Sequence, residues 1–138
     1  MGAVNNSRQP SALSRQCDTM QDFKNLKVWQ KSHALSLDVY RTTSRFPREE
    51  IYGLTSQIRR AASSISANIA EGCCRGSQAD FARFLYIAMG SASELECHLL
   101  LARDLGFLSE ADAEKLVSEL SEIKRMMTGL IKKLKSDS

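Results

Sequence analysis

The sequence predicts an all-α protein built as an antiparallel up-down-up-down four-helix bundle. Aromatic residues make up only 7% of its 138 residues and two prolines are present, a composition that favours long helices over a sheet. Apolar residues also recur at helical spacing in four successive segments joined by short loops. A bundle buries such apolar stripes efficiently. The expected helices span residues 24–45, 53–73, 77–105 and 109–135.

The chain is long enough for one core and one domain. Residues 23–135 should form the bundle, and the polar, aperiodic residues 1–22 should form a disordered tail. A second methionine, Met20, is a candidate natural start, in which case residues 1–19 are an extension.

The first predicted helix carries two apolar stripes. One contains Leu26, Trp29, His33, Leu37 and Tyr40, and the other contains Val28, Leu35 and Val39. The helix should end before Phe46 and Pro47, because proline disfavours helical backbone at the residue before it.

The third and fourth helices have recognisable ends. Ser77 and Ser109 are expected N-caps, each followed three residues later by an aspartate. Gly106 should end the third helix in a left-handed conformation. The core stripes should be Phe81, Phe84, Leu85, Ala88, Ala92, Leu95, Leu99 and Ala102 on the third helix, and Leu116, Leu120, Ile123, Met127, Leu130 and Leu134 on the fourth.

The second predicted helix carries two different stripes. Leu54, Ile58, Ala61, Ile65 and Ile69 form its apolar face. A second face presents hydrogen-bonding groups among small residues, and we expect this polar ladder to be buried or half-buried: Gln57, Arg60, Ser64, Asn68 and Glu71.

Arg83, Tyr86 and Glu94 on the third helix complete the ladder as a candidate site. One interpretation is a polar ligand site. The favoured alternative is structural, with Arg60 or Arg83 pairing with Glu71 or Glu94 across the helices or between subunits.

Metal, cofactor and membrane functions find little support in the sequence. Four cysteines are present without a CxxC pair, which argues against zinc and favours reduced thiols in the cytoplasm. No apolar run reaches the roughly 18–20 residues needed to span a bilayer. We expect a cytoplasmic protein with no cofactor and no small-molecule substrate.

Catalytic patterns are equally weak, and we expect a protein that is not an enzyme. Glu94 is followed by His98 at a spacing that differs from the Glu-x-x-His of di-iron bundles, and no second copy exists. The segment GCCRGS is not a P-loop. The serines lie within predicted helices, where their small size explains them.

Two long segments resemble a known family. LKVWQKSHALSLDVYRTTSRFPREEIYGLTSQIRRAASSISANIAEG and FARFLYIAMGSASELECHLLLARDLGFLSE are similar to the family named for the protein encoded in intervening sequences of bacterial 23S ribosomal RNA genes. The resemblance covers residues 23–134. It implies an antiparallel four-helix bundle, a homopentamer, and an association with RNA or the ribosome inferred from where some of the family's genes lie.

The family pattern falls on a defined set of positions, with two departures. Met89 stands where members often have Arg, and Cys73-Cys74 replaces a more usual aromatic or small pair. Losing that Arg weakens a polyphosphate-binding interpretation of the third helix. The matching positions are Phe46-Pro47, Gly53-Leu54, Gln57, Arg59-Arg60, Ser64-Ile65, residues 68–72, residues 83–85, Gly90-Ser91, residues 94–96 and Leu105-Gly106.

The resulting hypothesis is a non-catalytic oligomeric binding or scaffold protein that associates with structured RNA or ribosomal RNA. The net charge is +3, and a pentamer would multiply it. Without an evident aromatic platform, we expect contacts to the RNA backbone and its shape. The alternative is a protein-protein assembly adaptor that binds no nucleic acid. The candidate RNA-binding residues are Arg41, Arg45, Arg48, Arg59, Arg75, Lys132, Lys133 and Lys135.

Overall fold

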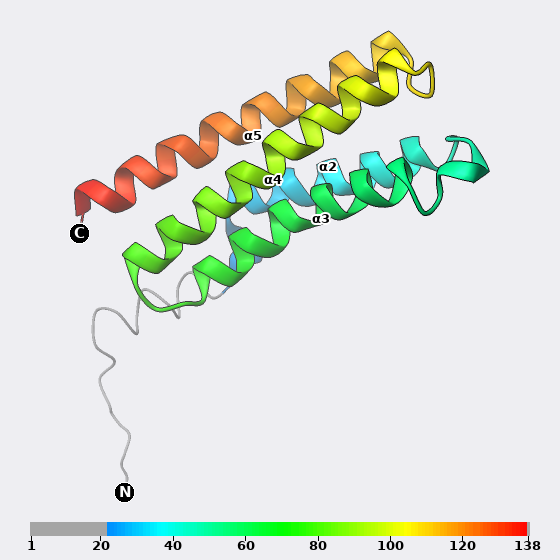
Figure 1. Cartoon of the computed structure of the whole chain (residues 1–138). Coiled ribbons are helices and arrows are strands. Elements are labelled where there is room, and N and C mark those ends of the chain that lie inside the picture. The colour runs from blue at the N-terminus through cyan, green and yellow to red at the C-terminus, as the bar shows by residue number, and fades with distance from the viewer. Residues whose placement is uncertain (1–21, 138) are drawn as a thin grey trace, which may run out of the picture.

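Four long helices and two short 3-10 turns make up the computed structural model, which describes residues 22–137 (Figure 1). The predicted all-helical class is confirmed, since no strand occurs among these residues. The predicted tail, apart from Asp22, lies outside the described residues. The elements are η1 (Phe23–Asn25), α2 (Lys27–Thr43), η2 (Arg48–Glu50), α3 (Leu54–Cys73), α4 (Gln78–Asp104) and α5 (Glu110–Asp137).

Each long helix packs against two others: α3 against α2 and α4, and α5 against α4 and α2. Along the contact of α2 with α5, Lys31 meets Glu122 and Asp38 meets Lys115, so rising numbers in one helix meet falling numbers in the other. The chain therefore has two distinct ends (Figure 1). We call residues 22–27, 71–83 and 132–137 the terminal end, and residues 41–53 and 103–115 the loop end.

The predicted caps of α4 and α5 are confirmed. Ser77 Oγ accepts a hydrogen bond from the Asp80 N–H at 3.1 Å, and Ser109 Oγ accepts one from the Asp112 N–H at 3.0 Å. Gly106 has φ +82°, and the Phe107 N–H donates to the Ala102 carbonyl at 2.9 Å, as in a Schellman motif.

The starts of α2 and α3 differ from the sequence prediction. Leu26 is extended and its N–H closes the η1 turn on the Phe23 carbonyl, so α2 begins at Lys27. At α3 the Leu54 N–H donates to Glu50 Oε1 at 3.1 Å. This carboxylate from the preceding 3-10 turn supplies the cap that the glycine at position 53 lacks.

The core lies between the helices and contains one of the two stripes predicted on α2. Val28, Leu35 and Val39 are buried, whereas Leu37 and Tyr40 on the other stripe are 44% and 45% exposed. The apolar stripe of α3 is buried throughout. On α5 the stripe ends with Ile131 and Leu134 buried, while Leu130 is only half-buried against the core.

Close contact between α3 and α4 depends on Gly72. A Cβ at this position would lie 2.7 Å from Phe84 Cβ and 3.0 Å from Phe81 Cδ1. Real Cβ atoms essentially never approach other heavy atoms as closely as the first of these distances. The buried residues Ala88 and Ala92 of α4 are also small. The last turn of α3 therefore packs directly onto the first turns of α4.

None of the helices between residues 22 and 137 combines the length and apolar character that crossing a membrane requires.

Gly72→Ala should destabilise the protein. Alanine gains up to about 1 kcal/mol in helix propensity, but the overpacking against Phe84 costs typically 1–3 kcal/mol, so we expect a net loss of about 1 kcal/mol in urea unfolding. Gly129→Ala is the matched control, because a Cβ on this α5 glycine meets nothing within 4 Å. It should leave stability unchanged or raise it. Equal unfolding midpoints for both variants would contradict the close contact.

Candidate nucleic-acid interface

The candidate RNA-binding residues divide between the two ends of the molecule. Arg75, Lys132, Lys133 and Lys135 lie at the terminal end, and Arg41, Arg45 and Arg48 lie at the loop end. The terminal end carries seven Lys and Arg side chains against four Asp and Glu, and the loop end carries five against six. Positive charge is therefore concentrated at the terminal end.

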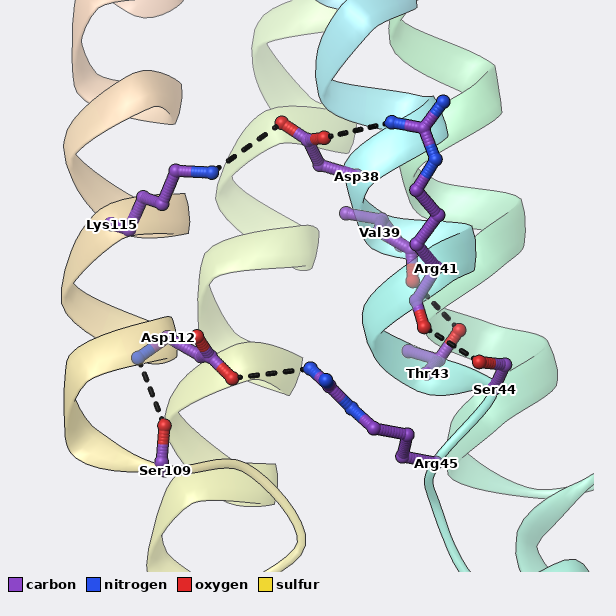
Figure 2. Close-up of polar contacts among 9 residues, drawn as sticks. All are labelled: Asp38, Val39, Arg41, Thr43, Ser44, Arg45, Ser109, Asp112 and Lys115. Carbon is purple, nitrogen blue, oxygen red and sulfur yellow. Dashed lines mark hydrogen bonds and ion pairs between the residues drawn. The ribbon is translucent and has the colours of Figure 1, made fainter.

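At the loop end two of the three candidate arginines, Arg41 and Arg45, lie beside carboxylates (Figure 2). Arg41 pairs with Asp38 at 3.3 Å, and the same carboxylate lies 3.9 Å from Lys115 of α5. Arg45 reaches Asp112 of α5 at 3.3 Å. These pairs are largely exposed and individually weak. They nevertheless reduce the positive electrostatic potential that the loop end would present to an RNA phosphate backbone.

Arg59 is committed to contacts inside the chain. Its Nε donates to Thr43 Oγ1 at 2.9 Å, and one Nη donates to the Tyr40 carbonyl at 3.2 Å. The guanidinium also lies 4.7 Å from the centre of the Tyr40 ring. Arg59 therefore joins α3 to the C-terminal turn of α2, a structural role that the sequence did not reveal.

At the terminal end two arginines converge on one aromatic ring. The guanidinium carbons of Arg75 and Arg83 lie 5.1 Å and 4.7 Å from the centre of the Phe84 ring. Arg75 also pairs with Glu71 at 3.1 Å, and Arg83 with Asp80 at 3.5 Å. The close contact of α3 with α4 thus gathers cations from two segments around one half-buried phenylalanine.

The lysines of α5 extend this basic end. Lys132 and Lys133 are exposed. Lys135 donates a hydrogen bond to the Tyr86 hydroxyl of α4 at 3.2 Å, and its Nζ lies 5.4 Å from the centre of that ring. Arg83 and Tyr86 belonged to the predicted polar ladder. The structure places Arg83 at the terminal end and Tyr86 next to it, beside Lys135.

The middle of the polar ladder links α3 to α4. Ser64 and Asn68 are half-buried, and Asn68 Nδ2 donates to the Ser64 carbonyl at 2.8 Å. Across the helices, the hydroxyl oxygens of Ser64 and Ser91 are 2.9 Å apart. These small polar groups satisfy one another where the two helices touch.

The rest of the ladder does not have the predicted burial within one chain. Gln57, Arg60 and Glu71 are exposed on α3, and Arg83, Tyr86 and Glu94 are exposed on α4. The physical reason is that, among the long helices, α3 packs against α2 and α4 and α4 packs against α3 and α5, which leaves one side of each helix uncovered.

The predicted pairing of Arg60 or Arg83 with Glu71 or Glu94 is also absent within the described chain. Glu71 and Arg83 pair with near sequence neighbours, and Glu94 lies 3.4 Å from His98 on its own helix.

The side chains that could coordinate a metal ion are not grouped together in the part of the chain that the structure describes. Among residues 22–137 no three His, Cys, Asp or Glu side chains are grouped so as to hold a metal ion. Cys73 is buried, Cys74 and Cys97 are exposed, and Cys17 lies outside the described residues.

A family model described as 23S rRNA-intervening sequence protein matches residues 24–129. The chain belongs to this family. The 23S rRNA-intervening sequence resemblance drawn from the sequence is therefore confirmed. A search of the curated proteins finds no significant match.

Among solved structures, the chain is similar to a protein of unknown function from the S23 ribosomal protein family of Bacteroides thetaiotaomicron VPI-5482. The two are 28% identical with a TM-score of 0.69, and the similarity covers 76% of this chain and 98% of that one.

Ser64→Leu should destabilise the fold, because the larger side chain has to enter the contact between α3 and α4. Overpacking of this kind typically costs 1–3 kcal/mol. The neighbouring Ser63→Leu is the matched control, since Ser63 is exposed on the same helix and the substitution is identical. Urea unfolding of both variants at one protein concentration makes the comparison. If the Ser64 variant were as stable as the Ser63 variant, the contact between α3 and α4 would have enough space for a leucine side chain, and the prediction would be wrong.

Proposed function

We propose that this 23S rRNA-intervening sequence family member is a non-catalytic, homo-oligomeric scaffold that binds structured RNA through its terminal end in the cytoplasm. The observation that carries the proposal is the gathering of Arg75, Arg83 and the α5 lysines at one end of the bundle. The family name supports ribosomal RNA as the class of partner.

Self-association is the second part of the proposal. The outer side of α4 exposes Ile87, Leu101 and Leu105 at 43%, 49% and 55%. These positions recur at helical spacing beside the uncovered part of the polar ladder. These exposed apolar side chains, with Glu94 of the polar ladder between Ile87 and Leu101 on the same face, favour burial against another copy. We propose the homopentamer that the family resemblance implies, built from antiparallel up-down-up-down bundles.

Oligomerisation would strengthen RNA binding. In a closed cyclic ring every copy is related by the same rotation, so the terminal ends of all copies lie at the same height along the axis. Five terminal ends then face one RNA phosphate backbone together. This raises the positive electrostatic potential at the RNA and makes the binding affinity depend more strongly on salt. The expected contacts are to phosphates and to the shape of the RNA.

The competing function is a protein-protein assembly adaptor that binds no nucleic acid. It is favoured by the loop end, where Tyr52 is 95% exposed, Ile51 is 48% exposed and charges of both signs nearly balance. Apolar docking at such a surface should change little with salt, whereas phosphate binding weakens steeply between about 50 and 200 mM salt.

Replacing Arg75, Lys132, Lys133 and Lys135 with alanine should abolish salt-sensitive RNA binding. Each lost phosphate contact lowers the slope of log affinity against log salt by about one. Fluorescence anisotropy with a fragment of 23S ribosomal RNA at two salt concentrations measures both the affinity and the slope.

The matched control removes four positive charges from the loop end by replacing Arg41, Arg45, Arg48 and Lys115 with alanine. This variant should retain most of the affinity, because three of these residues already face carboxylates. Equal losses in the two variants would refute a binding site at the terminal end. No RNA affinity in the unmodified protein at low salt would favour the adaptor.

Light scattering coupled to size exclusion should give five times the chain mass of 15.4 kDa. Replacing Leu101 and Ile87 with lysine should lower this mass, because charges would enter the proposed contact between copies. The control Leu37→Lys places a charge on the exposed side of α2 and should leave the mass unchanged. A monomer in the unmodified protein would refute self-association.

A further inference from the structure

A groove of about 350 Å³ lies at the terminal end between the start of α4 and the end of α5. This volume is at the lower end of the range typical of small-molecule sites. Ala82 and Leu134 are buried and form its apolar base. The full lining is Gln78, Ala79, Ala82, Arg83, Tyr86, Leu134 and Lys135.

The groove combines an aromatic ring with cations. Tyr86 is 53% exposed, so much of its surface is accessible from outside the bundle. Its hydroxyl is held by Lys135 at 3.2 Å, which fixes the ring against the end of α5. Arg83, with a side chain 55% exposed, lines the groove three residues earlier on α4.

This arrangement differs from that of the other exposed tyrosine on a long helix. Tyr40 is 45% exposed and also has a cation nearby, because Arg59 lies 4.7 Å from the centre of its ring. Tyr40 lies on α2 toward the loop end, where acidic and basic side chains nearly balance, and it lines none of the described grooves. Of these two tyrosines, Tyr86 is the one that lines a described groove at an end with an excess of positive charge.

We propose that this groove binds an unpaired base of single-stranded RNA. The base stacks on Tyr86 above Ala82 and Leu134, and the adjoining phosphates contact Arg83 and Lys135. The inference rests on the proposed RNA-binding function and deepens it, because it states that the terminal end binds single-stranded RNA in preference to duplex RNA.

Two physical arguments favour an unpaired base. Aromatic rings stack on bases that are splayed out of a helix, whereas the bases of an RNA duplex are already stacked inside it. A groove with apolar walls and cationic edges also matches a nucleotide, which has an apolar ring face and a negative phosphate. The net positive charge of the terminal end completes the complementarity.

The test is fluorescence anisotropy with dye-labelled oligouridine, compared with the same strand annealed to oligoadenosine. Tyr86→Leu should weaken binding to the single strand by about tenfold or more, and should change binding to the duplex by less than about twofold. Tyr86→Phe keeps the ring and should keep most of the affinity. Tyr40→Leu is the matched control and should bind both RNAs as the unmodified protein does. Circular dichroism and light scattering verify that each variant retains its fold and mass.

The possible outcomes separate the two proposals. Loss of single-strand binding in Tyr86→Leu, with rescue in Tyr86→Phe, supports the base site. Unchanged single-strand binding in Tyr86→Leu, or an equal loss on both RNAs, overturns it while leaving RNA binding by the terminal end in place. Binding to the 23S ribosomal RNA fragment without binding to oligouridine in the unmodified protein overturns the base site alone, and absence of binding to any of these RNAs overturns both proposals.

Discussion

Close packing of α3 against α4 is the constraint on which the rest of the molecule depends. Gly72 allows the last turn of α3 to touch Phe81 and Phe84, and the Ser64 and Ser91 hydroxyls meet farther along the same contact. The short loop between the helices can then hold Arg75 beside Phe84, while Arg83 approaches the same ring from α4. A wider separation would move Arg75 away from α4. Helix packing therefore determines the charge distribution at the terminal end.

The two ends use their charges differently. At or near the loop end, ion pairs link α2 and the segment that follows it to α5, since Asp38 pairs with Lys115 and Arg45 pairs with Asp112. At the terminal end, Arg75 and Arg83 pair with nearby carboxylates of Glu71 and Asp80 and also lie over the Phe84 ring. Contact with an aromatic ring does not neutralise a cation, and the terminal end keeps an excess of positive charge because it carries seven Lys and Arg side chains against four Asp and Glu. The same residue types thus hold the bundle together at one end and create a positive surface at the other.

The sequence was sufficient to predict structural features that depend on residues close together along the chain. Helical periodicity identified the buried stripe of α3, and the serine and aspartate pairs located the caps of α4 and α5. It could not predict features that require knowing which sides of a helix are covered. Gln57 and Arg60 lie on a polar stripe that periodicity alone could not distinguish from a buried one. The position of Tyr86 beside Lys135 likewise depends on the packing of α5 against α4.

The contact between α2 and α5 has a consequence for how the chain folds during synthesis. The partners in this contact are far apart in sequence, as with Lys31 and Glu122, whereas α3 and α4 are joined by a short loop. Contacts between near segments carry a small loop-closure cost and form readily, while distant ones pay more. We expect the α2–α3 and α3–α4 hairpins to form on the emerging chain before α2 contacts α5. The part of α2 that packs against α5 can be covered only after the last helix has been synthesised, so a nascent chain that stops before α5 exposes that surface.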